Sequence, residues 1–365
     1  MAKKGFEGSS VPAVLQQVCA RSGWALCVGA GTSVPAFPRW GDLVQRLLAE
    51  DVGSANAVSL AKSLSQSFGP DALLQAAQDR LDCKDEKFAK MLSTALYADI
   101  KDKLGKGSWA ETVRVLNAHH HGQLRPDQWD SFLRTIRSHY PSLTAISIAQ
   151  VLASAIDVDK GPSTVLSFNA EPLLYALLNG CISSLQSANS KRRGTPLVRK
   201  AVTDRVTRAT ADRVAGRMPF VFCHGLLPIE TSAHVGPLDA SVDKLVFSES
   251  DYLQLANTSF SWQSSVFMDT CISRSVVFIG LSFSDPNIRR WLAWIHRNRV
   301  VELKGVFKSE EDSARHYWLA KRPSSLDEQK WTESVVAHLG VRLVWLEEWS
   351  DVGKVLRAML GLTPS

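Results

Sequence analysis

Short apolar runs recur along the chain, and helical spacing follows several of them. The run WALCV at 24–28 is apolar at every position, which is typical of a strand that a parallel sheet buries on both faces. After it, Leu43, Val44, Leu47 and Leu48 fall on one helical face. This alternation predicts a doubly wound α/β fold. The predicted strands are 24–28, 164–168, 220–224, 244–247, 275–280, 316–320 and 341–346.

Residues 51–159 break the alternation. They contain helical patterns, including DALLQAAQDRL and LTAISIAQVLASAI, and no convincing strand. We therefore predict a Rossmann-like domain with a doubly wound parallel sheet, formed by residues 1–50 and 160–365, and a helical insertion at 51–159. Within the second part, Asp285 followed by Pro286 predicts the capped start of a helix.

The composition is that of an ordinary globular protein, with 45% apolar and 21% charged residues in 365 positions. No apolar stretch approaches the ~18 residues that a membrane span needs, and none follows the N-terminal lysines. We therefore expect a cytoplasmic protein without membrane contact. The six cysteines are scattered and form no C-x-x-C pair, so the sequence indicates neither a disulfide framework nor a zinc site.

The excess positive charge is local. The net charge is +6, and between 181 and 217 only Asp204 and Asp212 oppose a run of basic residues. Such a run forms a solvated surface, or it faces a phosphate or a partner, and the sequence leaves these alternatives open. The basic residues of this segment are Lys191, Arg192, Arg193, Arg199, Lys200, Arg205, Arg208, Arg213 and Arg217.

A glycine-containing turn, VGAGTS, lies between the first predicted strand and its helix. Gly29 and Gly31 allow a sharp turn and a close backbone approach, which suits a dinucleotide phosphate and equally suits a plain strand-to-helix turn. A dehydrogenase fingerprint would have a third glycine where Val34 stands, and an acid at the end of the second strand. Glu50 and Asp51 have roughly that spacing but end a helix, which disfavours a dehydrogenase.

Three further polar stretches follow predicted strands, where open α/β sheets place their ligand crevice. Asn169 in SFNAEPLL offers an uncharged donor and acceptor, or it caps a helix. His224 in FCHGLLP precedes a glycine, and it is either a reactive group or a structural histidine. In GLSFSDPNIR, Gly280, Ser282 and Asp285 suit a ribose hydroxyl or phosphate, or they form a capped turn.

Taken together and in this order, the four segments resemble the sirtuin fold family over 20–50 and 160–350. They are most similar to the sirtuin-like domains of bacterial proteins that destroy NAD in antiphage defence. GAGTS with FPRW resembles the family's first nucleotide loop, and SFNAE resembles its T-x-N-x-D element. CHG resembles its catalytic histidine motif, and GLSFSDPNIR its G-x-S element for the adenosine ribose.

The resemblance implies that NAD is the substrate and that His224 and Asn169 are catalytic. The NAD-binding residues that it implies are Gly29, Ala30, Gly31, Thr32, Ser33, Pro38, Trp40, Glu171, Gly280, Ser282 and Asp285. The chain departs from the family in lacking the two cysteine pairs that hold a structural zinc in its deacylases, so no metal site is expected. Glu171 and Ser167 replace the usual aspartate and threonine, and residues 34–37 lack the usual glycine.

The expected reaction is hydrolysis of the bond between nicotinamide and ribose. Positive charge develops on the sugar while nicotinamide leaves neutral, so the placement of water governs the rate. We expect Asn169 to position a water or a ribose hydroxyl and His224, with an ordinary pKa near 6.5, to act as general base. The alternatives are an NAD-dependent protein deacylase, an ADP-ribosyltransferase, and a non-catalytic NAD-binding assembly subunit.

An NAD hydrolase endangers its own cell, so its activity must be controlled. The chain has no obvious sensor domain, and we therefore expect a homo-oligomer or a separately encoded activator such as a HerA-like ATPase. The helical insertion and the basic segment at 191–217 are the candidate contact surfaces, and nucleic acid is expected to act only indirectly.

Overall fold

The computed structural model describes residues 23–82, 85–194, 202–207, 214–227, 229, 246, 250–251, 261–306 and 313–362. The strands pair in one seven-stranded sheet, and every pairing is parallel. Their bounds are β1 Trp24–Val28, β2 Thr164–Ser167, β3 Thr203–Val206, β4 Met218–Phe222, β5 Ser275–Ile279, β6 His316–Lys321 and β7 Val341–Leu346.

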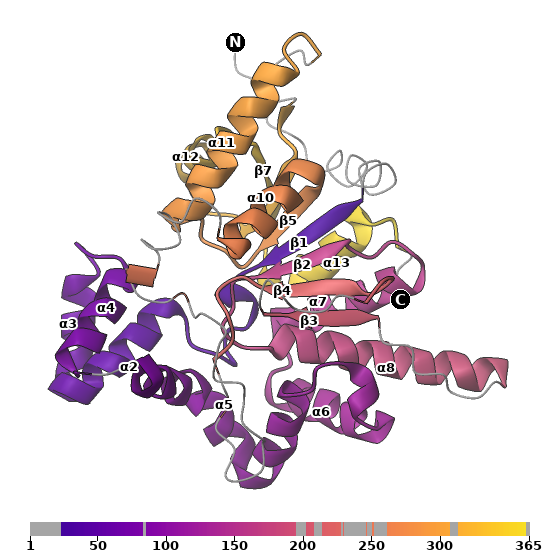
Figure 1. Ribbon diagram of the computed structural model, residues 1–365, viewed down its shortest axis with the longest axis horizontal. Helices are drawn as coiled ribbons and strands as arrows, with labels where there is room; N and C mark the ends of the chain where they lie inside the picture. The colour runs from indigo at the N-terminus through magenta and orange to yellow at the C-terminus, as the bar shows by residue number, and fades with distance from the viewer. Residues whose placement is uncertain are drawn as a thin grey trace.

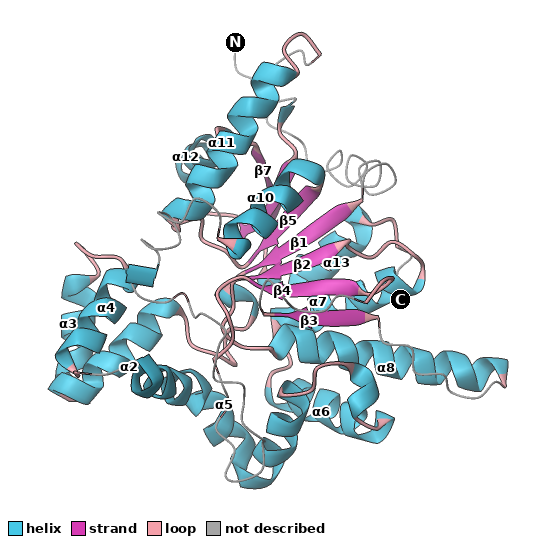
Figure 2. Ribbon diagram, in the orientation of Figure 1, coloured by secondary structure: helices cyan, strands magenta, loops and turns pink. Residues whose placement is uncertain are grey.

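The strand order is β3-β4-β2-β1-β5-β6-β7, so the predicted doubly wound sheet is confirmed (Figure 2). The chain places β2, β3 and β4 on one side of β1 and then returns to add β5 on the other side. The order therefore reverses between β1 and β5. Open α/β sheets bind ligands outside the carboxyl ends of the strands at such a switch point.

One strand of the sheet lies outside the predicted set, and one predicted strand lies almost wholly outside the described residues. β3 was not predicted, because Thr203, Asp204 and Arg205 give it no apolar run, and as an edge strand it pairs only with β4. The predicted strand at 244–247 lies outside the described residues except for Val246, whose amide donates to the carbonyl oxygen of His224 (3.2 Å).

Helices occupy the described chain between β1 and β2, as predicted for 51–159, and they also cover both faces of the sheet (Figure 1). The division of the chain into a domain and an insertion stays a prediction. The helices are α2 Trp40–Val52, α3 Ser54–Leu64, α4 Pro70–Arg80, α5 Asp85–Leu116, α6 Pro126–His139, α7 Thr144–Asp157, α8 Leu173–Arg193, α10 Trp262–Ser273, α11 Pro286–Glu302, α12 Leu326–Ala337 and α13 Val352–Met359.

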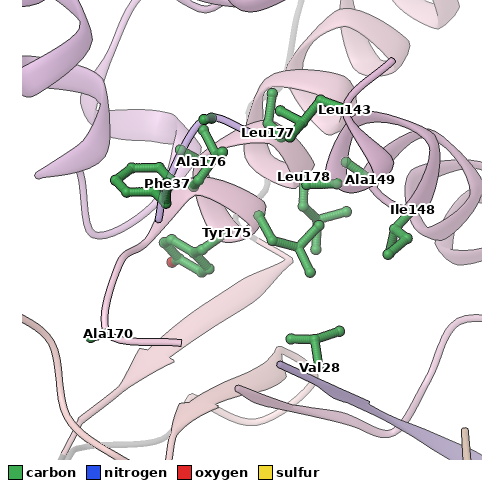
Figure 3. Close-up of a cluster of buried hydrophobic side chains, with 14 of the residues drawn as sticks. Val28, Phe37, Leu143, Ile148, Ala149, Ala170, Tyr175, Ala176, Leu177 and Leu178 are labelled. Atoms are coloured by element: carbon green, nitrogen blue, oxygen red, sulfur yellow. The ribbon is translucent and has the colours of Figure 1, made fainter. Parts of the chain in front are cut away.

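The sheet is buried on both faces because alternate residues of each strand enter different cores. Leu26 and Val28 of β1 belong to the core formed with α2, α5, α7, α8 and α13, and Ala25 and Cys27 belong to the core formed with α10, α11 and α12. In Figure 3, Val28 lies below side chains of α7 and α8 in the first of these cores. No described helix is long and apolar enough to cross a lipid bilayer.

Candidate active site

The loops after β1 and β5 touch at the switch point, and glycines make the contact possible. The Gly29 amide donates to the carbonyl oxygen of Ile279, and the Gly31 amide donates to that of Gly280, both at 3.0 Å. A Cβ on Gly29 would lie 2.6 Å from the Gly280 oxygen, and Gly280 itself has a φ of +71°. These glycines therefore pack one loop on the other, and the Gly31 N–H is already occupied rather than offered to a phosphate.

A buried polar cluster follows the same turn and joins the loops after β1 and β2. Ser33 Oγ donates to Glu171 Oε1 (2.6 Å), and Asn169 Nδ2 donates to the same oxygen (2.9 Å) and to Ser33 Oγ (3.2 Å). Leu173 N, at the start of α8, donates to Glu171 Oε2 (2.5 Å). The cluster thus brings together three residues that the sequence analysis assigned to the site.

The hydrogen bonds of this cluster fix the orientation of the Asn169 amide. Glu171 as a carboxylate only accepts, and Thr32 Oγ1 and Ser33 Oγ already donate to Gly29 O and Glu171, so towards Asn169 all three can act only as acceptors. The amide nitrogen must therefore face them. Asn169 is only 4% exposed, and its Oδ1 atom is buried without a hydrogen-bond partner among the described residues. A buried acceptor of this kind is satisfied by a ligand or a water.

Burial also sets the ionisation of Glu171. Loss of solvent raises the pKa of this carboxyl to about 7, against the opposing hydrogen bonds from Ser33, Leu173 N and Asn169. Near neutral pH, both the protonated and the ionised forms of Glu171 are therefore populated. Both forms can accept from Asn169, and the ionised form accepts more strongly because the hydrogen bond is then charge-assisted.

A small pocket opens above the polar cluster, with a cavity volume of about 30 Å³ that continues into open solvent. Its floor is polar and its walls are mostly aromatic and aliphatic, as in many small-molecule sites. Six lining residues were predicted as site residues: Ala30, Ser33, Pro38, Trp40, Asn169 and Glu171. Five others were not: Phe37, Leu43, Leu96, Phe168 and Ala170. Phe37 belongs to the motif FPRW and Phe168 to SFNAE, although neither was predicted as a site residue, whereas Leu96 of α5 carries no local signal.

His224 lies beside this pocket but does not line it. Its ring packs edge-on against Phe168, which does line the pocket, with ring centroids 4.8 Å apart. Burial lowers the pKa of His224 to about 3, so the ordinary value near 6.5 expected from the sequence is wrong in this conformation. The imidazole is therefore neutral at physiological pH. Gly225, at a φ of +77°, turns the chain immediately after it.

The loop after β5 uses its predicted polar residues mostly for its own structure. Asp285 caps α11 by accepting from the backbone N–H groups of Asn287 (2.8 Å) and Ile288 (3.4 Å), which confirms the predicted helix start. Burial raises the pKa of the Asp285 carboxyl. Ser282 is exposed and hydrogen-bonds Ser284 (2.6 Å). Neither residue lines the pocket, and their nucleotide contacts stay predictions.

The basic segment is described only in part. Arg217 pairs with Asp204 (3.0 Å), and Arg205 packs its guanidinium over the Phe222 ring, so both are engaged within the molecule. Arg199, Lys200, Arg208 and Arg213 lie outside the described residues. Over the described chain, no group of three or more His, Cys, Asp or Glu side chains is placed to hold a metal ion.

Residues 219–344 match the SIR2-like domain family. The C-terminal part of the chain contains a SIR2-like domain. The match begins in β4 and ends in β7, and it includes the histidine loop and the loop after β5, while the loop after β1 and Asn169 precede it. A SIR2-like domain indicates an enzyme that uses NAD. Comparison with curated proteins gave no match to the chain.

Proposed function

We propose that the protein is an NAD glycohydrolase that cleaves the nicotinamide–ribose bond to give nicotinamide and ADP-ribose. One observation carries the proposal: Asn169, whose buried amide oxygen has no hydrogen-bond partner among the described residues, lines a pocket at the carboxyl edge of the sheet. The SIR2-like domain of the same chain supports NAD as the molecule that enters this pocket.

The fixed amide restricts what Asn169 can hold. Because its nitrogen has two hydrogens and faces three acceptors within the cluster, on Glu171, Ser33 and Thr32, the oxygen is left for a ligand, and an oxygen binds a donor. A ribose hydroxyl and a water molecule are both donors. Asn169 therefore orients one of these against the anomeric carbon, while the Glu171 carboxylate favours the positive charge that develops on the ribose as nicotinamide departs.

His224 supplies the base in this scheme. The neutral imidazole is in the form that accepts a proton from water, but the depressed pKa makes it a weak base while it stays buried. The two phosphates of bound NAD favour the imidazolium and raise this pKa. Because Phe168 contacts both His224 and the pocket, we expect its side chain to move when substrate binds.

Loss of either catalytic side chain tests the assignment. We expect His224→Ala to lower the rate of NAD consumption by about 10² to 10⁴, the usual effect of removing a general base, and Asn169→Ala to lower it substantially too. His139→Ala is the control, because His139 ends α6 and does not line the pocket. Consumption by the His224→Ala and Asn169→Ala proteins at the parental rate would show that neither residue takes part.

The burial of His224 favours one alternative, a protein that binds NAD without cleaving it. In that case calorimetry would detect binding, and NAD would survive prolonged incubation. A deacylase or transferase would instead yield O-acetyl-ADP-ribose or a modified protein, which product analysis separates from free ADP-ribose.

We further propose that NAD depletion serves antiphage defence and is controlled by oligomerisation or by a separately encoded partner. The helical region and the basic segment are the surfaces proposed for these contacts. A timed assay of NAD loss, with the pure protein alone and with the product of a neighbouring gene, tests this control directly.

A further inference from the structure

Helix α5 belongs to the helical region between β1 and β2, yet it contacts the candidate active site. Leu96 lines the pocket, and the neighbouring Tyr97 is 4% exposed. Arg46 of α2 holds the same turn of α5, because its Nη1 donates to the Ala95 carbonyl oxygen (2.6 Å) and its Nη2 pairs with Asp99 (2.5 Å). This part of α5 is therefore fixed against α2, the helix that follows the loop after β1.

Tyr97 touches two of the loops that form the site. Its ring packs edge-on against Phe37, a wall of the pocket, with centroids 5.4 Å apart. Its hydroxyl donates to the carbonyl oxygen of Leu227 (3.3 Å), in the loop that carries His224. The amide of Leu227 donates in turn to the carbonyl oxygen of Ala170 (2.9 Å), between Asn169 and Glu171. One side chain of the helical region thus connects the loops after β1, β4 and β2.

Helix α5 folds back on itself, so that Trp109 packs against Tyr97. Tyr97 and Trp109 would be about 18 Å apart along a straight helix, at 1.5 Å per residue, but their ring centroids are 6.2 Å apart. The chain folds back at Gly105, whose φ of 69° and ψ of 169° are not helical. The Tyr97 ring therefore packs against Phe37 and Trp109, and burial raises the pKa of its hydroxyl, which stays a hydrogen-bond donor.

We propose that Tyr97 is a positioning residue: through Leu227 it holds the His224 loop in register with the Asn169 loop, and so links the helical region to the reaction centre. The proposal rests on the proposed function for its effect on catalysis. Its structural part, the anchoring of the loop at 222–227, is independent of what the protein catalyses. A partner that shifts α5 would act on the site through the same bond.

Tyr97→Phe removes only the hydroxyl and keeps the ring. The matched control is Tyr140→Phe, which removes another buried hydroxyl of the helical region, one that has no hydrogen-bond partner among the described residues. We expect Tyr97→Phe to lower kcat for NAD by roughly three- to tenfold, the effect of one hydrogen bond, with KM changed less than about twofold. Amide exchange in the peptide covering 219–227 should become faster in Tyr97→Phe and stay parental in Tyr140→Phe.

Each result decides the proposal. Parental exchange in Tyr97→Phe overturns the anchoring, whether or not the protein cleaves NAD. Faster exchange with parental kcat in Tyr97→Phe overturns the positioning role. If both variants lose kcat and melting temperature equally, the Tyr97 hydroxyl has no specific role, and Tyr97 only contributes to packing. If the parent protein leaves NAD intact, the proposed function fails, and the exchange comparison still judges whether Tyr97 holds the loop.

Discussion

The substitution Asn169→Asp tests the polar cluster with almost no change in shape. It replaces the Nδ2 donor by an acceptor 2.9 Å from the Glu171 carboxylate. Two ionised carboxylates at about 3 Å repel by roughly 5 kcal/mol at an effective dielectric constant of 20, so the pair instead retains a proton. Glu171 has a pKa of about 7, and keeping it protonated at pH 8 therefore costs about 1.4 kcal/mol.

The lost hydrogen bond to a buried carboxylate adds about 1.5 kcal/mol. We therefore expect Asn169→Asp to lower the free energy of unfolding by about 3 kcal/mol at pH 8. At pH 5 the parent already has Glu171 protonated, so the proton uptake disappears and about half of the loss remains. Urea denaturation of both proteins at the two pH values measures this difference.

The double variant Asn169→Asp/Glu171→Gln exchanges the donor and the acceptor. Its glutamine can donate to the new carboxylate and still accept from the Leu173 amide, which now donates to Glu171 (2.5 Å). We expect it to recover at least half of the stability lost at pH 8. If Asn169→Asp is as stable as the parent at pH 8, or if the double variant is no more stable than the single one, the deduced hydrogen-bond network is wrong.

The geometry of the site leads us to expect three more results. The ionised Glu171 accepts more strongly from Asn169 and carries the negative charge that favours the developing positive charge on the ribose. We therefore expect kcat/KM to rise as pH increases through about 7 and then level off, and Glu171→Gln to remove this rise. A parental pH profile in that variant would assign the titration to another group. The raised pKa also means that the stability contribution of Glu171 is fully present below pH 4.5 and is lost as the pH rises through about 7. Gly29→Ala should destabilise the protein by roughly 2–4 kcal/mol, because the added Cβ would meet the Gly280 oxygen at 2.6 Å. Gly41 of α2 has open space around it, so Gly41→Ala is the control and should be neutral or slightly stabilising. Thermal unfolding measures both effects. Equal melting temperatures for the two glycine variants would contradict the loop contact.

The sheet was predictable because strands buried on both faces are mostly apolar, as β1 is throughout and β5 is after Ser275. β3 escaped prediction because its polar residues find partners inside the fold: Thr203 donates to Asn179 (2.9 Å), and Asp204 pairs with Arg217 (3.0 Å). Such pairings join distant segments, and no local pattern reports them.

The site was predictable where it lies in loops that follow strands, as with Ser33, Asn169 and Glu171, because parallel strands place their carboxyl ends at one edge. The contribution of α5 was not, since Leu96 reaches the pocket only through tertiary packing. The burial of His224 was also hidden, because the ring contact with Phe168 depends on how two neighbouring loops pack.

The central claim is that the floor formed by Ser33, Asn169 and Glu171 receives the nicotinamide ribose of NAD for cleavage. The most direct measurement is the amount of nicotinamide and of ADP-ribose that the purified protein releases from NAD with time, beside Asn169→Ala at the same concentration. We expect the parent to release the two products in equal amounts and the variant to release far less of both. Intact NAD in the parent reaction, or equal release by the two proteins, would contradict it.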